Sequence, residues 1–149
     1  MNQATTILTR TGVAYKLTGN TTVAGDFMRI GWGEVDFLND KSGIGYPNQN
    51  VYRIGISHQI NERFEFRAGY NHADRFAFSQ YANNNFMGPG ISYRSYAFGV
   101  SYKPVNDYEV NLGYEKHLPE KLEGSGPSTG SRIDVNYGYI LLGVSKIFN

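Results

Sequence analysis

The sequence predicts an all-β fold: an antiparallel transmembrane β-barrel of which about seven strands are present. Three observations carry this prediction. Apolar and polar side chains alternate strictly over segments of seven or more residues. Short polar turns alternate with long loops along the chain, and tyrosines stand at both ends of the apolar strand faces. Membrane barrels place an aromatic girdle at those two positions.

Seven segments show the alternation expected of a strand with one apolar face. In chain order they are Ile7 to Leu17, Thr22 to about Phe37, Tyr52 to Ile60, Phe64 to Asn71, Tyr96 to Tyr102, Tyr108 to Glu115 and Tyr139 to Phe148. In the fifth segment, for example, large side chains at even positions face away from small ones at odd positions. The opposite face of most segments carries charged residues among glycine and serine, which favours a wet lumen over a dry core.

The connections divide the strand ends into two groups. Short turns follow the first, third and fifth segments, whereas residues 39–50, 74–92 and 119–131 form long connections rich in Gly, Pro, Asn and Ser. Residues 52–70 also align without a gap on residues 96–114, so the repeating unit is a hairpin followed by a long loop. Bacterial barrels have short turns on the periplasmic side and long loops outside, which predicts the orientation.

The composition excludes several classes of protein. Fourteen basic and thirteen acidic residues nearly cancel, so no nucleic-acid partner is expected. The absence of cysteine excludes disulfides and thiolate metal sites. No apolar stretch approaches the roughly 20 residues of a membrane-spanning helix. A soluble lipocalin-like barrel remains as an alternative, but its outside would be one large exposed apolar patch.

Several segments resemble a known family. GISHQINERFEFRAGY, FGVSYKPVNDYEVNLGYEKH, the Asp26 to Trp32 stretch and the closing YILLGVSKIF are similar to the C-terminal half of the FadL/OMPP1/TodX family of outer-membrane transporters. The resemblance covers nearly the whole chain. It implies a 14-stranded barrel in the bacterial outer membrane that carries long-chain fatty acids and other hydrophobic compounds, with an N-terminal hatch that has no counterpart here. No ligand-binding residue of the family transfers to this segment.

Residues 1–149 are therefore expected to be a single domain, the incomplete C-terminal portion of a barrel. Seven strands is an odd number, and an open sheet would expose unpaired backbone groups to lipid. We expect the barrel to be completed either by a missing N-terminal half or by a second copy of the chain. Its other expected partners are outer-membrane lipids and a hydrophobic small-molecule ligand.

The candidate substrate-contact site lies in the aromatic loop that follows the fourth strand. Its candidate residues are Phe76, Phe78, Tyr81, Phe86 and Met87. Two interpretations remain open: the loop offers an apolar landing site for substrate, or it folds over the barrel mouth and packs on itself.

Lumenal Arg67 is a further candidate, because a guanidinium can pair with the carboxylate of a fatty acid. A ladder of ion pairs with Glu65 and Glu109 is the alternative interpretation.

No catalytic residue, metal site or cofactor is predicted. His58 and His72 fall in the apolar register as girdle residues, and the Glu115–His117 pair lacks a third metal ligand. The function that the sequence favours is passive diffusion of hydrophobic small molecules through the barrel, without enzyme activity. The alternatives are a small structural or adhesive barrel, and a barrel lipase or acyltransferase with a serine nucleophile.

Overall fold

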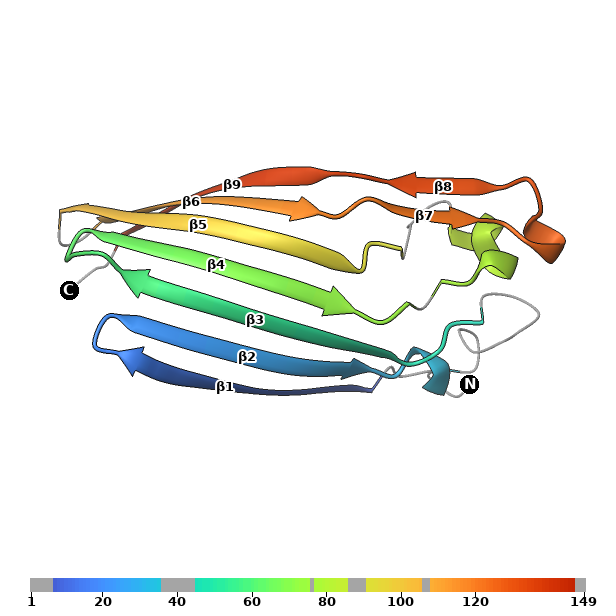
Figure 1. Cartoon of the computed structure of the whole chain (residues 1–149), viewed down its shortest axis with the longest axis horizontal. Coiled ribbons are helices and arrows are strands. Elements are labelled where there is room, and N and C mark those ends of the chain that lie inside the picture. The colour runs from blue at the N-terminus through green and yellow to red at the C-terminus, as the bar shows by residue number, and fades with distance from the viewer. Residues whose placement is uncertain (1–6, 36–44, 76, 86–90, 106–107, 147–149) are drawn as a thin grey trace.

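Seven strands form one curved antiparallel sheet (Figure 1), so the predicted all-β fold is confirmed. The structure is a computed structural model that describes residues 7–35, 45–75, 77–85, 91–105 and 108–146. The strands, in their order across the sheet, are β1 (Leu8–Thr18), β2 (Thr21–Ile30), β3 (Gln49–Gln59), β4 (Phe64–Ala73), β5 (Arg94–Val105), β6 (Tyr108–His117) and β9 (Gly138–Lys146). Each predicted segment overlaps one of them, and the predicted end of the last segment at Phe148 lies outside the described residues.

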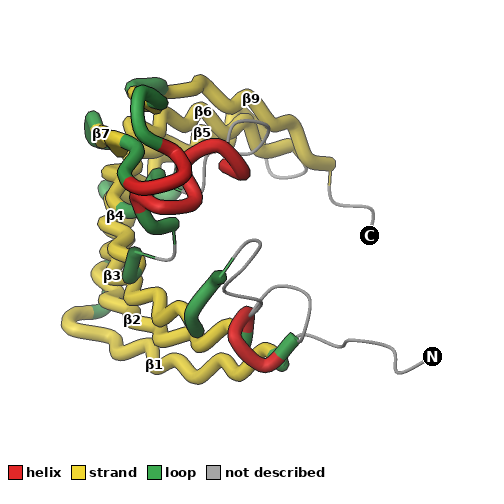
Figure 2. Tube along the Cα trace, turned by 90° about the vertical axis from the view of Figure 1, so that its right-hand side faces the viewer, coloured by secondary structure: helices red, strands yellow, loops and turns green. Residues whose placement is uncertain are grey.

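The sheet is strongly curved. Seen end on, it forms a C in which the two edge strands, β1 and β9, lie apart (Figure 2). The short turns gather at one end of the sheet and the long connections at the other (Figure 1), as the sequence predicts. No helix within the described ranges is both long enough and apolar enough to cross a membrane.

The second strand is shorter than predicted. It ends at Ile30, because Gly31 leaves the extended conformation (φ −82°, ψ 56°) and a 3₁₀ turn, η1 (Trp32–Glu34), follows. The backbone N–H of Gly31 donates to the carbonyl of Ile7 (2.8 Å), which closes the β1–β2 pair at this end. The predicted end at Phe37 is wrong by several residues, and Phe37 itself lies outside the described residues.

The long connection between β6 and β9 contains a hairpin that the sequence did not predict. β7 (Glu120–Glu123) pairs with β8 (Arg132–Val135) around a 3₁₀ turn, η3 (Gly126–Ser128). In Figure 1 this hairpin continues the direction of β6 and β9 beyond the sheet. A second 3₁₀ segment, η2 (Ser79–Asn85), lies in the connection between β4 and β5 and contacts η3.

The buried apolar residues gather at the long-loop end. Their main cluster consists of Ala77, Ala82, Ile91, Tyr93, Leu122 and Val135, with Ile133 packed against it. We call β7, β8, η2, η3 and residues 91–93 the outer module. The large apolar side chains of the sheet are instead mostly exposed on its convex face, for example Leu142 with 74% of its surface accessible.

Candidate functional site on the concave face and the outer loops

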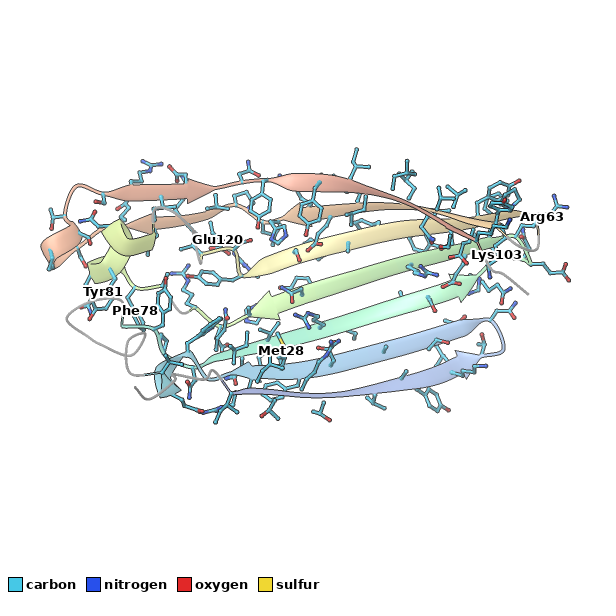
Figure 3. The ribbon with its side chains drawn as sticks, turned by 180° about the vertical axis from the view of Figure 1, so that it is seen from behind. Met28, Arg63, Phe78, Tyr81, Lys103 and Glu120 are labelled. Carbon is cyan, nitrogen blue, oxygen red and sulfur yellow. The ribbon has the colours of Figure 1, made fainter. Side chains whose placement is uncertain are left out.

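Strand register assigns every side chain of the sheet to one of two faces. Directly paired residues, and residues two apart in one strand, share a face. Glu65, Arg67 and Asn71 therefore lie on the same face as Arg53 and Ser57. Figure 3 views the sheet from this concave side, where Met28 and Lys103 are labelled. The concave face is polar, as predicted for a lumen.

Toward the long-loop end, two arginines share one carboxylate on the concave face. Nη2 of Arg10 lies 2.7 Å from Asp26, and Nη1 of Arg53 lies 3.2 Å from the other oxygen of that carboxylate. Arg53 also donates through Nε to the side-chain oxygen of Asn71 (3.2 Å). This network crosses four strands, from Arg10 on β1 to Asn71 on β4.

Toward the short-turn end, the ladder considered for Arg67 is present. Arg67 donates through Nε to Glu65 (2.8 Å), and its Nη2 lies 3.9 Å from Glu109. Glu109 in turn lies 3.6 Å from Nζ of Lys103. These groups are partly open to solvent, so each pair contributes little to stability. These two ion pairs place carboxylates of this chain beside the positive charge of Arg67.

A row of small residues runs between the two networks. Its members lie in direct register across five strands: Ala14, Ala24, Gly55, Gly69 and Ala97. Two hollows of about 470 and 450 Å³ lie along this row and meet at Arg53. Because the row lacks large side chains, the concave face is hollowed along it.

A polar cluster stands where β6, β9 and the start of β5 meet. Nε2 of His117 lies 3.2 Å from Glu115, and Nδ1 lies 2.5 Å from the hydroxyl of Ser92. The imidazole stacks on the ring of Tyr137 with centroids 4.4 Å apart. Tyr139 donates its hydroxyl proton to Glu115 (2.7 Å). The predicted Glu115–His117 proximity is therefore real, but within the described part of the chain no group of three His, Cys, Asp or Glu side chains forms a metal site.

The described part of the aromatic loop packs against the β7–β8 hairpin. Tyr81 is buried, whereas Phe78 has 45% of its surface exposed (both labelled in Figure 3). The backbone N–H of Ser125 donates to Ser79 (3.0 Å), which ties η2 to the hairpin. Phe76, Phe86 and Met87 lie outside the described residues.

Gly45, in the connection between β2 and β3, packs against the ring of Tyr81. It adopts a positive φ of 63°, and a Cβ at this position would collide with that ring. Two long connections therefore meet at Tyr81.

Glu120 is a buried carboxylate that sequence reasoning missed. Arg94 donates to it through Nη2 (2.6 Å) and Nε (2.9 Å), and Nη2 of Arg75 lies 3.5 Å away. The guanidinium of Arg75 also lies 5.4 Å from the centre of the Tyr93 ring. A charged residue in an apparent loop carries no sequence signal of burial, because its partners come from the β4–β5 connection and the start of β5.

Aromatic rings border the apolar band of the convex face at both ends. Toward the long loops, ring centroids lie 5.3 Å apart for Phe27 and Tyr52 and 5.0 Å apart for Tyr70 and Tyr96. Toward the short turns, Phe64 stacks on Tyr102 at 4.7 Å. His72 lies beside Tyr52 (6.3 Å) and His58 pairs in register with Phe66, so both histidines lie on the face predicted for them.

The apolar convex face, its two aromatic borders and the polar concave face define the wall of a transmembrane β-barrel. Solved structures that are similar to this chain include transporters. They include the toluene transporter TodX of Pseudomonas putida (TM-score 0.69, 19% identity) and the toluene transporter TbuX of Ralstonia pickettii (TM-score 0.65, 15% identity). A TodX monoaromatic hydrocarbon channel mutant aligns with a TM-score of 0.68 and 22% identity.

These alignments cover 95% of this chain but only 33 to 35% of the transporters, so the chain spans about a third of their length. They confirm at the level of fold the resemblance predicted from the sequence. No family model and no curated protein matches the sequence.

Proposed function

We propose that this chain forms part of the wall of an outer-membrane channel through which hydrophobic small molecules diffuse passively. The observation that carries the proposal is the contrast between the two faces of the sheet, apolar outside and polar but hollow inside. The transporters of similar fold, which are named for toluene and monoaromatic hydrocarbons, support the substrate class. Long-chain fatty acids are included in the proposal, because their apolar chains are buried by the same forces.

The aromatic loop is the proposed landing site for substrate. Phe78 supports this role, because it is exposed beside a module whose other apolar side chains are buried. Phe76, Phe86 and Met87 are proposed to add to the same apolar surface, and the buried Tyr81 to support it from below. Arg67 is proposed as a contact farther down the lumen, where a carboxylate ligand competes with Glu65 for its guanidinium.

The lumen is proposed to close when β1 and β9 pair with further strands. Within the described sheet each of these two strands pairs along one edge only. Every unpaired N–H or C=O group that faces lipid costs several kcal/mol. Closure is proposed through additional barrel strands or through a second copy of this chain. The mass of the protein in detergent, combined with cysteine crosslinking between β1 and β9, distinguishes these arrangements from a closed monomer.

The first test is membrane partitioning followed by uptake. We expect the protein to fractionate with outer membranes, to require detergent for extraction, and to show heat-dependent mobility in gels, as β-rich membrane proteins do. Cells that contain it should take up toluene or oleate faster than cells without it. A protein that stays soluble and monomeric without detergent would contradict the membrane location. Unchanged uptake of both compounds would contradict transport.

The landing site is tested by substitution in the aromatic loop. Changing Phe76, Phe78 and Phe86 together to Ser should slow uptake, because the apolar contact surface is lost, while heat-dependent mobility stays normal. Asn61→Ser, in a short turn at the opposite end, is the matched control. Normal uptake by the triple variant would assign the loop to packing alone.

A structural or adhesive barrel is the second candidate, and one observation favours it. The outer module has its own buried core and projects beyond the sheet (Figure 1), as a platform for contact with another surface would. Deleting the β7–β8 hairpin separates the two functions. An adhesive role shows cell or matrix attachment that is lost with this deletion, whereas a channel shows no attachment in either form and changes only its uptake, because the landing loop packs on the hairpin.

A further inference from the structure

The convex face carries positive charge directly above a pair of tyrosines. Tyr70 and Tyr96 pair in register, and Lys116 pairs with Tyr96 on the next strand. Arg94 lies two residues before Tyr96 and pairs with His72. All five side chains therefore belong to the convex face. Arg94, His72 and Lys116 lie on its long-loop side.

We call the long-loop side of the convex face at Arg94, His72 and Lys116 the margin. The contacts of its basic residues do not neutralise its positive charge. Arg94 is half exposed, and it uses Nε and Nη2 to bind Glu120. Because Arg75 approaches the same carboxylate (3.5 Å), two guanidinium groups share one negative charge. Lys116 donates to the neutral amide oxygen of Asn136 (2.5 Å) and keeps its full charge. The margin therefore carries a surplus of positive charge.

An apolar groove lies below the two tyrosines on the same face. Ala68 stands in register between Ile56 and Phe98, and its short side chain leaves a depression between these larger neighbours. The groove has a volume of about 390 Å³, and Tyr70 and Tyr96 line it together with these residues. Along the strands, the order is thus cation, aromatic ring and apolar groove.

We propose that this part of the convex face binds lipid A, the phosphorylated glycolipid of the outer leaflet. A lipid A phosphate accepts hydrogen bonds from Arg94 and Lys116, which are charge-assisted and therefore among the stronger ones. Its sugar rests against Tyr70 and Tyr96 at the height where membrane proteins concentrate tyrosine. One acyl chain fills the groove at Ala68. Basic pockets beside membrane segments recognise lipid headgroups by the same chemistry.

The inference rests on the outer-membrane location proposed above, with the long loops outside. That orientation places the cations at the outer leaflet, where lipid A resides, and charge complementarity selects a phosphorylated lipid over a neutral one. Phosphatidylglycerol, an anionic lipid with a single phosphate, is the competing ligand that the experiment must separate.

The test measures binding to the full chain extracted from outer membranes in mild detergent. Diphosphoryl lipid A is titrated while the intrinsic tryptophan and tyrosine fluorescence and the melting temperature are recorded. We expect saturable binding of diphosphoryl lipid A, with dephosphorylated lipid A and phosphatidylglycerol each binding about tenfold or more weakly. The double variant Arg94→Gln, Lys116→Gln should weaken diphosphoryl lipid A by a similar factor.

Two further variants keep the test decisive if the double variant disturbs the outer module. Lys116→Gln leaves the Arg94–Glu120 pair intact, and it should still weaken lipid A several-fold. Ala68→Phe fills the groove without changing charge, and it should weaken lipid A but leave heat-dependent mobility normal. Arg63→Gln removes a cation from a short turn at the opposite end (labelled in Figure 3), and it should have no effect.

Three results would overturn the proposal: equal binding of phosphorylated and dephosphorylated lipid A, equal binding of phosphatidylglycerol, or unchanged affinity in both Lys116→Gln and Ala68→Phe. The uptake assay separates this failure from that of the proposed function. A protein that transports toluene or oleate but shows no lipid A preference refutes the lipid site alone. A protein that needs no detergent refutes both.

Discussion

The sheet and the outer module of this chain obey opposite rules for apolar side chains. In the outer module, Ile91 and Ala82 each expose about 1% of their surface, as in the core of a soluble protein. In the sheet, Leu142 and Ile140 expose more than 70%, and apart from Val51 the buried side chains along its concave face are small or polar. Water drives the packing of the module, whereas in the proposed membrane location lipid solvates the convex face of the sheet. The same residue type therefore has a different role in each region.

The largest effect should follow from a cavity in the outer module. Ile91→Ala is expected to cost about 2 to 5 kcal/mol of local stability, because the core around it cannot collapse fully. Hydrogen exchange of residues in β7 and β8 is the measurement, and it should accelerate while exchange in the sheet stays slow. Leu142→Ala makes the same kind of truncation on the convex face, where lipid fills the space. An equal cost at both positions would remove the distinction between the regions.

The next effect tests the two faces of the sheet against each other. Leu112→Arg places a charge on the convex face and should cost roughly 2 to 4 kcal/mol. Asn111→Arg adds the same charge to the concave face, next to Glu109, and should be mild. Denaturant unfolding of the protein in lipid vesicles measures both. If the order were reversed, the faces would be misassigned and the concave side would contact lipid.

The smallest effect concerns the hydroxyl of Tyr93 in the outer module. This hydroxyl is buried and has no hydrogen-bond partner among the described residues, although the backbone of Ala77 lies nearby. Tyr93→Phe should therefore change stability by less than about 1 kcal/mol, and can increase it. Thermal unfolding monitored at the module measures the change. A large loss would reveal a hydrogen bond that the folded module depends on.

The same residue gives the outer module a dependence on alkaline pH. Burial raises the pKa of Tyr93 above its ordinary value near 10, an effect that the nearby Arg75 opposes. Because the pKa is raised on folding, the stability from the neutral hydroxyl is complete below about pH 10 and is lost as the pH rises from there through the folded pKa. Hydrogen exchange in the module should accelerate in that range, and Tyr93→Phe should reduce the acceleration. If the variant and the parent protein showed the same acceleration, the alkaline loss of stability would not come from the ionisation of Tyr93.

Most of the sheet could be predicted from the sequence, because alternation has a strict period of two and the large apolar side chains fall on one face. The ladder of Arg67 with Glu65 and Glu109 was also predictable, since parity alone places the three residues on one face. The sequence predicted that the second strand extends to Phe37, whereas it ends at Ile30. The prediction was wrong because the alternation in the sequence continues past Gly31, where the backbone leaves the strand.

The outer module could not be predicted, and the reason is its short elements. β7 and β8 have four residues each, too few for alternation to be distinguished from chance. The bonds of Glu120 to Arg94 and of Ser92 to His117 each join a long connection to one end of a strand, across 26 and 25 residues of sequence. Such contacts depend on how the loops pack, and a local pattern does not encode them.

The strand order also has a consequence for the route of assembly. Strands β1 to β5 each pair with the next strand along the chain, and the β7–β8 hairpin returns the chain so that β9 joins β6. Each new pairing then joins strands that are separated by a single turn or a single long connection, and such sequence-local pairing lowers the entropic cost and favours rapid folding. The sheet can therefore gain strands one hairpin at a time. The repeated unit of two strands and a loop is then also the unit that is added in each step of assembly.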